Sequence, residues 1–299
     1  MKEEYVRLSG GFHNEVFYDE KHNRIIRISA NGKSADYVRQ ELQWMDFLHS
    51  NGIPLSNPAR QIELDDGLVK ACFEYVRGNP VDVTNPAHWN EKNFKQFGRI
   101  LGRMHALSKG YNIGNNRRPV WTKKNPDVFG IRDGLAGWLM EEFDRLMGAL
   151  QQYKPSPDTF GLIHNDFHQG NFIVRETGEV VVIDFDECAF NWFAQDLAVL
   201  FYHACWQQDS FNGEAEAFSR RFMHHVFSGY LSETELHPGT IAQIPVFLKL
   251  REIFLYHLFD RKWDKAHLED WQEYTLQDLE RKIRNREPYA GIADFSAYL

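Results

Sequence analysis

One short stretch of this 299-residue chain concentrates side chains that can do chemistry. Residues 164–171 read HNDFHQGN, and apolar segments flank them on both sides. Asp184 comes thirteen residues after Asn171, at the end of the apolar run 180–183, and Asp186 follows it. Polar groups held between two strand-like segments form a rigid loop, which is the setting that positioned chemistry requires.

Two kinds of site fit these residues poorly. Asn and Asp often cap the backbone of a polar turn, but the density of ionisable and amide groups here exceeds what capping needs. A transition-metal hydrolase would take its ligands from the same region. Such zinc sites use several imidazoles on facing loops, and only two histidines lie in this stretch. The candidate ligands would be His164, Asp166, His168, Asp184 and Asp186.

Phosphoryl transfer fits better. It needs a carboxylate that orients the substrate hydroxyl and takes its proton, and an amide oxygen and a second carboxylate that bind Mg²⁺. Asp166, Asn171 and Asp184 supply this set. The order Asp-x4-Asn, a β-hairpin and then Ile-Asp-Phe matches the spacing of a kinase catalytic loop and metal loop. We therefore interpret Asp166 as the catalytic carboxylate and Asn171, Asp184 and Asp186 as metal-binding residues.

The elements around this loop divide the chain into two unequal parts. Residues 1 to about 78 are strand-rich, with short strands expected at 15–18, 24–29 and 68–76 and one helix at 35–50. Beyond about residue 91 the apolar residues recur at helical spacing, interrupted by strand-like runs at 172–175 and 180–185. The predicted helices of this part begin near 91 and continue at 134–152, 194–208, 213–231, 240–260 and 268–284.

The motifs resemble those of the aminoglycoside phosphotransferase and choline kinase-like family, a branch of the protein-kinase-like fold. That family uses an H-x-D-x-x-x-x-N loop and an I-D-x-[DE] metal loop, as residues 164–171 and 183–186 do here. Asp186, at the position of the glycine in the D-F-G motif of protein kinases, favours this branch. Asp196 is similar to the family's aspartate that braces the catalytic loop, and His164 and His168 are expected to support the site.

The resemblance implies an α+β, bilobal kinase-like fold. The small β-rich N-terminal lobe would span residues 1–78 and cover the nucleotide. The larger, mostly helical C-terminal lobe would span 79–299, carry the catalytic and metal loops and bind the substrate. We expect His105, on the first helix of the C-terminal lobe, to be a buried structural histidine.

The same resemblance places the nucleotide. The segment 9–17 would cover the phosphates, since glycines allow close backbone approach to phosphate oxygens. Arg27 would hold the phosphates, with Glu41 as its partner and Lys33 as the alternative cation. The stretch 73–78 is similar to the hinge whose backbone binds adenine. The residues predicted to contact nucleotide are Gly11, Phe12, His13, Asn14, Arg27, Glu41, Glu74, Tyr75 and Val76.

The implied activity is ATP- and Mg²⁺-dependent transfer of the γ-phosphoryl group to a hydroxyl of a small molecule. Amine-bearing acceptors such as aminoglycosides, choline-like compounds, amino alcohols or sugars are candidates. Two alternatives stay open: a bacterial-type Ser/Thr protein kinase of the same fold, and a nucleotide-binding module without catalysis. Candidate acceptor-lining residues in the helical lobe are Trp192, Asp260, Trp263, Asp264, Glu269, Asp270 and Trp271.

Composition narrows the partners. Hydrophobic residues make up 43% of the chain and charged residues 25%, which excludes disordered and collagen-like classes. Lys and Arg number 34 against 42 Asp and Glu, a net charge of −8 that argues against nucleic-acid binding and against a polybasic membrane surface. Three cysteines without a paired motif and an N-terminus without an apolar segment predict a cytoplasmic protein with free thiols.

Overall fold

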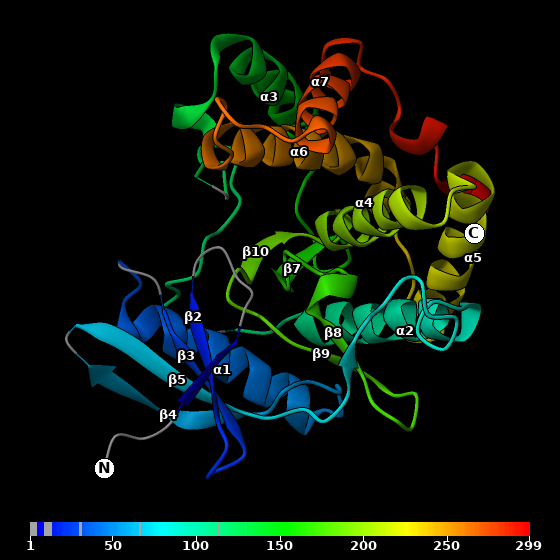
Figure 1. The fold of residues 1–299 in the computed structure, drawn as a ribbon. Coiled ribbons are helices and arrows are strands. Elements are labelled where there is room, and N and C mark those ends of the chain that lie inside the picture. Colours follow the sequence, from blue (N-terminus) through cyan, green and yellow to red (C-terminus); the bar gives the residue numbers. More distant parts are fainter. Residues whose placement is uncertain (1–4, 9–13, 30–31, 66, 113, 129) are drawn as a thin grey trace.

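The computed structural model describes the chain except residues 1–4, 9–13, 30–31, 66, 113 and 129. An antiparallel sheet with the strand order β1-β2-β3-β5-β4 forms the N-terminal lobe (Figure 1). Its strands are β1 Tyr5–Leu8, β2 Glu15–Asp19, β3 Arg24–Ile28, β4 Pro58–Asp65 and β5 Leu68–Glu74. The register places Arg27 between Val16 of β2 and Ala71 of β5, in the middle of the sheet.

Helix α1 (Ala35–Ser50) packs against β4 and β5. It begins where the Ser34 hydroxyl accepts a hydrogen bond from the backbone N–H of Tyr37, at 3.2 Å. It ends before Gly52, whose φ of 80° glycine adopts without strain. The apolar face of α1 is buried, and Glu41 is buried with it. This burial brings the Glu41 carboxylate toward β3.

The C-terminal lobe surrounds two small sheets with helices. β6 (Asn79–Pro80), β8 (Phe172–Val174) and β9 (Val180–Val182) form one sheet, and β7 (Phe160–Ile163) pairs with β10 (Ala189–Trp192). The helices are α2 Glu91–Ser108, α3 Gly137–Leu150, α4 Phe193–Phe211, α5 Ala215–Leu231, α6 Pro238–Lys262 and α7 Asp270–Arg284. Short 3-10 turns lie at Arg132–Gly134, Gln169–Asn171, Tyr289–Gly291 and Ser296–Tyr298.

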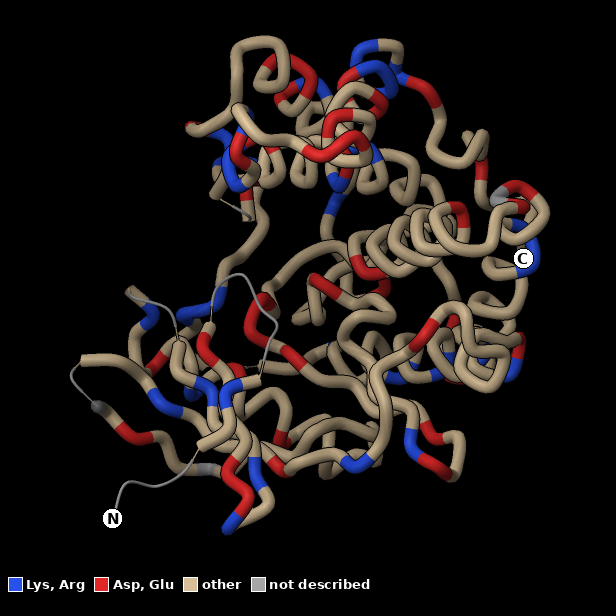
Figure 2. Tube along the Cα trace, viewed as in Figure 1, with Lys and Arg blue, Asp and Glu red and all other residues tan. Residues whose placement is uncertain are grey.

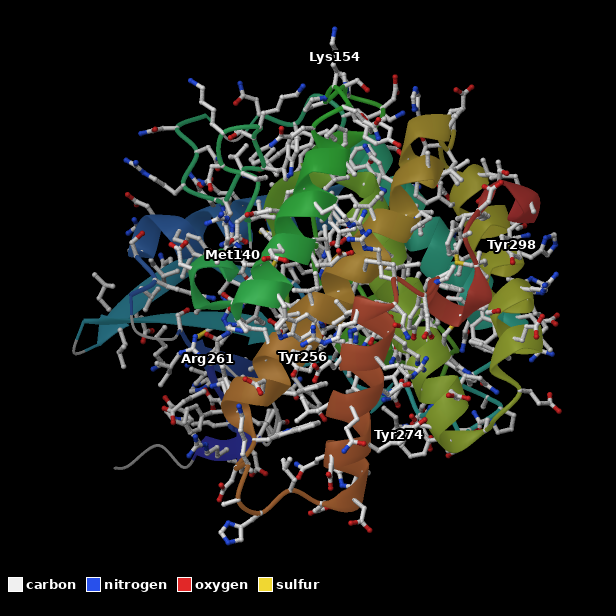
Figure 3. All side chains as sticks on the ribbon, turned by 90° about the horizontal axis from the view of Figure 1, so that it is seen from above. Met140, Lys154, Tyr256, Arg261, Tyr274 and Tyr298 are labelled. Atoms are coloured by element: carbon white, nitrogen blue, oxygen red, sulfur yellow. The ribbon has the colours of Figure 1, made fainter. Side chains whose placement is uncertain are left out.

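The helices of the C-terminal lobe form layers around α4. Helix α4 packs on both α5 and α6, and most of its residues are buried. Helices α3 and α7 pack against α6 at the end of the molecule far from the N-terminal sheet (Figures 1 and 3). The rings of Trp138 on α3 and Tyr256 on α6 meet edge to face, with centroids 5.5 Å apart. The catalytic loop is therefore supported by a packed layer of helices, of which α4 contacts the loop directly.

The α+β, bilobal architecture expected from the sequence is confirmed. The predicted helix at 35–50 has the observed bounds, but β1 and β4 were not predicted. The strand expected at 180–185 ends at Val182, because the chain turns through Asp184 at a φ of 61°. The three cysteines are free and buried. Within the described ranges, no helix is long and apolar enough to cross a membrane.

Charged residues of both signs are interspersed over the helical lobe. Figure 2 shows Lys and Arg beside Asp and Glu along α7 and around α3. From residue 79 onward the chain has 24 Lys and Arg against 30 Asp and Glu, a net charge of −6. On α7, pairs such as Lys282–Asp278 and Arg284–Glu280 join opposite charges within one turn. The excess of negative charge is thus spread over solvated helix surfaces.

The contact between α2 and α5 generates the first prediction. A Cβ added at Gly98 would lie 1.9 Å from the backbone oxygen of Val226, closer than any relaxed structure allows. We expect Gly98→Ala to lower the free energy of unfolding by about 1–3 kcal/mol, because the helices must move apart. The matched control is Gly148→Ala in α3, where nothing lies within 4 Å of the new methyl group.

The control should raise stability by up to about 1 kcal/mol, since alanine favours a helix over glycine. Urea unfolding followed by circular dichroism measures both variants. Equal stability changes in the two variants would contradict the close backbone contact.

Candidate active site

The catalytic loop follows β7 and is braced by the first turn of α4. The buried carboxylate of Asp196 accepts hydrogen bonds from the backbone N–H groups of His164 (3.1 Å) and Asn165 (2.6 Å). Its Oδ2 also lies 3.3 Å from Nε2 of His105, whose ring is fully buried and accepts from the Tyr230 hydroxyl at 2.9 Å. His105 is buried and hydrogen-bonded, as expected from the sequence.

His164 connects the catalytic loop to the metal loop. Its Nε2–H donates to the backbone oxygen of Ile183 at 3.1 Å, so Nδ1 is free to face the backbone N–H of Asp166 at 3.4 Å. Burial lowers the pKa of His164, which keeps the ring neutral in this role. The imidazole of His164 thus fixes the distance between the backbone of Ile183, which precedes Asp184, and the backbone of Asp166.

The carboxylate of Asp166 is held by three side chains. Oδ1 accepts from Nη2 of Arg251 at 2.8 Å, and Oδ2 lies 3.3 Å from Nε2 of His168. The amide of Asn171 donates to the backbone oxygen of Asp166 at 2.9 Å and lies 3.4 Å from Oδ2. Burial alone would raise the pKa of Asp166, but Arg251 and His168 outweigh it and hold the pKa well below its usual range. Asp166 is therefore ionised at neutral pH.

The metal loop places Asp184 beside other carboxylates. Part of the Asp184 residue faces solvent, yet the surrounding protein removes much of its hydration and raises its pKa to about 6. The charges of Asp186, Glu41 and Asp166 contribute to this rise, while Arg27 opposes it. An acidic cluster that destabilises its own charges is the environment in which a divalent cation binds favourably.

Asp186 joins the two lobes. Its Oδ2 accepts from Nδ2 of Asn14 at 2.8 Å and is paired with the ammonium group of Lys33. Its Oδ1 is buried, has no hydrogen-bond partner among the described residues and lies 3.9 Å from Nη2 of Arg27. Burial opposes ionisation, but Arg27 and Lys33 lower the pKa of Asp186. Lys33, the alternative cation of the sequence analysis, thus lies at the metal loop.

Arg27 and Glu41 form a buried, bidentate ion pair. Nη1 and Nη2 of Arg27 each donate to one oxygen of the Glu41 carboxylate at 2.7 Å. Burial disfavours the charge of Arg27, but Glu41 outweighs it and raises the pKa of the guanidinium. The structure therefore brings together the two residues that the sequence pairs, within reach of Asp186 and of the charge of Asp184.

The expected hinge follows β5. Both backbone groups of Glu74 are engaged, since its N–H donates to Asn57 and its oxygen accepts from the Ser56 hydroxyl, each at 2.8 Å. In the part of the chain that the structure describes, Tyr75 and Val76 make no backbone hydrogen bond. Their backbone groups, more than those of Glu74, are thus available for a nucleotide base. Of the predicted phosphate-covering residues, Gly11, Phe12 and His13 lie outside the described residues, while Asn14 contacts Asp186.

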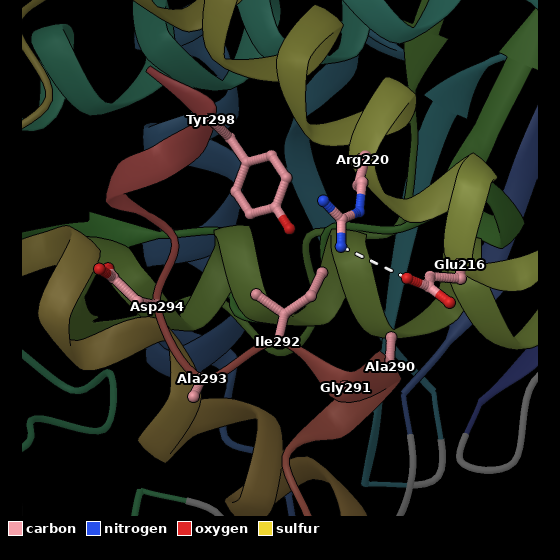
Figure 4. Close-up of a pocket in the computed structure, with 8 residues that line it drawn as sticks. All are labelled: Glu216, Arg220, Ala290, Gly291, Ile292, Ala293, Asp294 and Tyr298. Carbon is pink, nitrogen blue, oxygen red and sulfur yellow. Dashed lines mark hydrogen bonds and ion pairs between the residues drawn. The ribbon is translucent and has the colours of Figure 1, made fainter.

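Other sites in the chain are less suited to this chemistry. Among the described residues, no group of three His, Cys, Asp or Glu side chains could hold a metal ion by itself, which disfavours the hydrolase interpretation. A pocket of about 520 Å³ lies between α5 and the C-terminal segment. Figure 4 shows residues that line it. It is lined by residues such as Arg220 and Tyr298 and by none of the catalytic loop. Trp192, considered above as an acceptor-lining residue, is fully buried in the core.

Three residues at the site carry no sequence signal. The guanidinium of Arg118 donates to the backbone oxygens of Asp186 (2.5 Å) and Cys188 (2.7 Å) and stacks on the ring of Tyr37 in α1. Arg251 on α6 donates to Asp166, and His203 on α4 contacts the guanidinium of Arg251. Arg251 is separated from Asp166 by 85 positions, so only tertiary packing brings them together.

Comparisons with known proteins agree with this architecture. Residues 4–230 match the model of the phosphotransferase enzyme family described as APH. Amicoumacin kinase of Bacillus subtilis (strain 168) is 30% identical over 99% of this chain and 92% of that protein. A solved structure of the amicoumacin kinase hAmiN, in complex with AMP-PNP, Ca²⁺ and Ami, superposes with a TM-score of 0.88 at 27% identity. It covers 100% of this chain and 93% of that one.

More distant structures share the fold. A microcompartment-associated aminopropanol kinase has a TM-score of 0.71 at 20% identity and covers 96% of this chain and 93% of that one. An aminoglycoside 2'-phosphotransferase-IIIa has a TM-score of 0.62 at 17% identity, with 95% and 93% covered. These neighbours share the kinase-like fold with this chain. The chain belongs to the phosphotransferase enzyme family, and it is a phosphotransferase that acts on a hydroxyl of a small molecule.

The raised pKa of Asp184 generates the second prediction. The pKa of Asp184 is about 6 in the folded protein and near 3.9 in the unfolded chain. The folded protein is therefore most stable with respect to this group below about pH 4, where Asp184 is neutral. This stability is lost as the pH rises through about 6, because Asp184 then ionises in an unfavourable environment. We expect Asp184→Asn to raise the melting temperature of the metal-free protein at pH 8. The gain should be absent near pH 4, where both forms of residue 184 are neutral.

Differential scanning fluorimetry in EDTA over this pH range measures the effect. The matched control is Glu176→Gln, which removes an exposed carboxylate in the turn between β8 and β9. A lower melting temperature for Asp184→Asn at pH 8 would contradict the proposed electrostatic cost.

Proposed function

We propose that this phosphotransferase moves the γ-phosphoryl group of ATP, with Mg²⁺, to a hydroxyl group of amicoumacin or a chemically similar compound. The observation that supports this reaction is that Asp166, Asn171 and Asp184 lie together: Asn171 donates to Asp166, and the charge of Asp166 acts on Asp184. The acceptor is supported by the amicoumacin kinase relative, which matches the chain over nearly its whole length.

Asp166 is the proposed catalytic residue. Its ionised carboxylate would accept a hydrogen bond from the acceptor hydroxyl, orient the oxygen toward the phosphorus and take the proton late in the transfer. Arg251 and His168 each engage one oxygen of this carboxylate. A carboxylate oxygen has two lone pairs, so each oxygen retains the capacity to accept from a substrate.

The residues present fit a divalent metal ion shared with the nucleotide. Asn171 and Asp184 offer an amide oxygen and a carboxylate, hard ligands of the kind that Mg²⁺ prefers. The buried Oδ1 of Asp186 is a third oxygen, and it accepts no hydrogen bond from the described residues. Bound there, Mg²⁺ would offset the charge on the phosphates. Phosphate oxygens would complete such a site.

The remaining nucleotide contacts are proposed from the N-terminal lobe. Arg27 would bind phosphate oxygens, and Glu41 would orient its guanidinium. Lys33 and Asn14 contact Asp186 from the same lobe, so they are positioned to hold phosphates near the metal loop. Tyr75 and Val76 would bind the adenine edge. We also retain the boundary between the lobes near residue 78 and a cytoplasmic location as parts of this proposal.

The short connection after the metal loop favours a small acceptor over a protein. Asp196 comes only twelve positions after Asp184, and β10 fills part of this interval before α4 begins. A protein kinase needs an activation segment that orders a peptide. Aminopropanol and ethanolamine kinases and aminoglycoside phosphotransferases, all named for amine-bearing compounds, share the fold.

The third prediction tests the reaction. Purified protein with ATP and Mg²⁺ should release ADP when amicoumacin is added, and mass spectrometry should find the acceptor heavier by one phosphoryl group. Asp166→Asn should abolish this turnover. The variant should still give a measurable melting temperature and a measurable thermal shift with ATP, because the carboxylate acts only on the acceptor hydroxyl.

A parallel screen of aminoglycosides, amino alcohols, choline-like amines, sugars and model peptides completes the experiment. Phosphorylation of peptides alone would favour the protein kinase alternative. A thermal shift with ATP but no ADP release on any acceptor would favour the nucleotide-binding module. Near-normal turnover by Asp166→Asn would contradict the assigned role of Asp166.

A further inference from the structure

Arg251, outside the kinase motifs, holds the carboxylate of Asp166, and His203 contacts Arg251 in turn. Arg251 lies on α6 and His203 on α4, and both are buried. Nη2 of Arg251 donates to Oδ1 of Asp166 at 2.8 Å. Nε and Nη2 of the same guanidinium lie 3.0 and 2.7 Å from Nε2 of His203. We call Arg251 and His203 the guanidinium–imidazole pair.

The chemistry of this pair fixes the state of His203. A guanidinium has only donors, so Nε2 of His203 must present its lone pair, and its ring proton resides on Nδ1. Burial lowers the pKa of His203 well below its usual range, and the charge of Arg251 adds to this effect, which keeps that lone pair available. His203 therefore orients the guanidinium plane, and the ring of Phe254 lies 5.0 Å from the same cation.

A second imidazole holds the other oxygen of Asp166. The backbone N–H of Gly170 donates to Nδ1 of His168 at 3.0 Å, so the ring proton of His168 is on Nε2 and faces Oδ2 of Asp166. The rings of His168 and His203 stack with centroids 4.3 Å apart. Both carboxylate oxygens are thus engaged, and the carboxylate cannot rotate without breaking a contact on each side.

From this geometry we propose that Arg251, oriented by His203, is a positioning residue that fixes the Asp166 carboxylate for attack by the acceptor hydroxyl. The inference rests on the proposed role of Asp166. It goes beyond the family comparison, because the family model ends at residue 230 and α6 begins at Pro238. Helix α6 thus adds to the catalytic loop a constraint that the shared motifs do not contain.

The fourth prediction compares variants of this pair. Arg251→Gln should lower kcat for phosphoryl transfer to amicoumacin by about 100-fold, because a misplaced catalytic group costs this much in rate. Its KM for ATP should stay unchanged, since Arg251 contacts none of the described residues that are predicted to bind nucleotide. Arg251→Lys should have a higher kcat than Arg251→Gln, because an ammonium group can still pair with Asp166. It should stay below the wild type, because the ammonium group cannot contact His203 at the same time.

Variants of His203 separate orientation from packing. His203→Gln retains a side-chain acceptor for the guanidinium and should keep more of kcat than His203→Phe, which retains only the ring. Arg261→Gln, on the exposed surface of the same helix, is the matched control and should show wild-type kinetics (Figure 3). Melting temperatures and the folded fraction of each variant are measured alongside the kinetics.

Several results would overturn the inference: wild-type kcat for Arg251→Gln, equal losses for His203→Gln and His203→Phe, or losses that vanish when rates are normalised to folded protein. If the wild type releases no ADP with any acceptor, the proposed function fails, and crystal structures still test the positioning. The Asp166 carboxylate should be rotated in Arg251→Gln relative to the wild type. An unchanged carboxylate would overturn the inference.

Discussion

The buried carboxylate of Asp196 is the interaction on which the site depends. It accepts hydrogen bonds from the backbone N–H groups of both His164 and Asn165. Asp196 lies in the N-terminal turn of α4, where a helix favours negative charge. Asn165 adopts a φ of 72°, a conformation that Asn tolerates and that turns Asp166 out of the strand direction. A buried carboxylate without these donors would be costly. The loop and its brace therefore stabilise one another.

The metal loop is held just as firmly, but from both lobes. Arg118 binds the backbone oxygens of Asp186 and Cys188, and Lys33 and Asn14 reach the Asp186 side chain from the N-terminal lobe. Asp184, between these fixed points, has a φ of 61° and a raised pKa. Strain and electrostatic cost concentrated at one residue are typical of functional sites. The fold maintains an arrangement that is unfavourable without a cation, which is consistent with a metal role for Asp184.

Local patterns predicted most of the elements, and spacing predicted the catalytic loop. Helix α1 could be predicted to the residue because Ser34 and Gly52 mark its ends around a continuous apolar face. The pairing of Arg27 with Glu41 followed from the family resemblance. Strand β4 was missed because Pro58 opens it and a register shift interrupts its pairing with β5. Arg251 and His203 could not be predicted, since nothing local distinguishes a buried arginine that pairs with Asp166 from one on a helix surface.

The central claim is that Asp166 faces the acceptor while Asn171 and Asp184 hold the metal of the nucleotide. A crystal structure with AMP-PNP, Mn²⁺ and amicoumacin tests it directly, since anomalous scattering locates the metal. The account predicts a metal peak bound by oxygens of Asn171 and Asp184 and by phosphate oxygens, with an acceptor hydroxyl at hydrogen-bond distance from the Asp166 carboxylate. A metal bound away from Asp184, or an acceptor whose hydroxyl groups all lie away from Asp166, would contradict it.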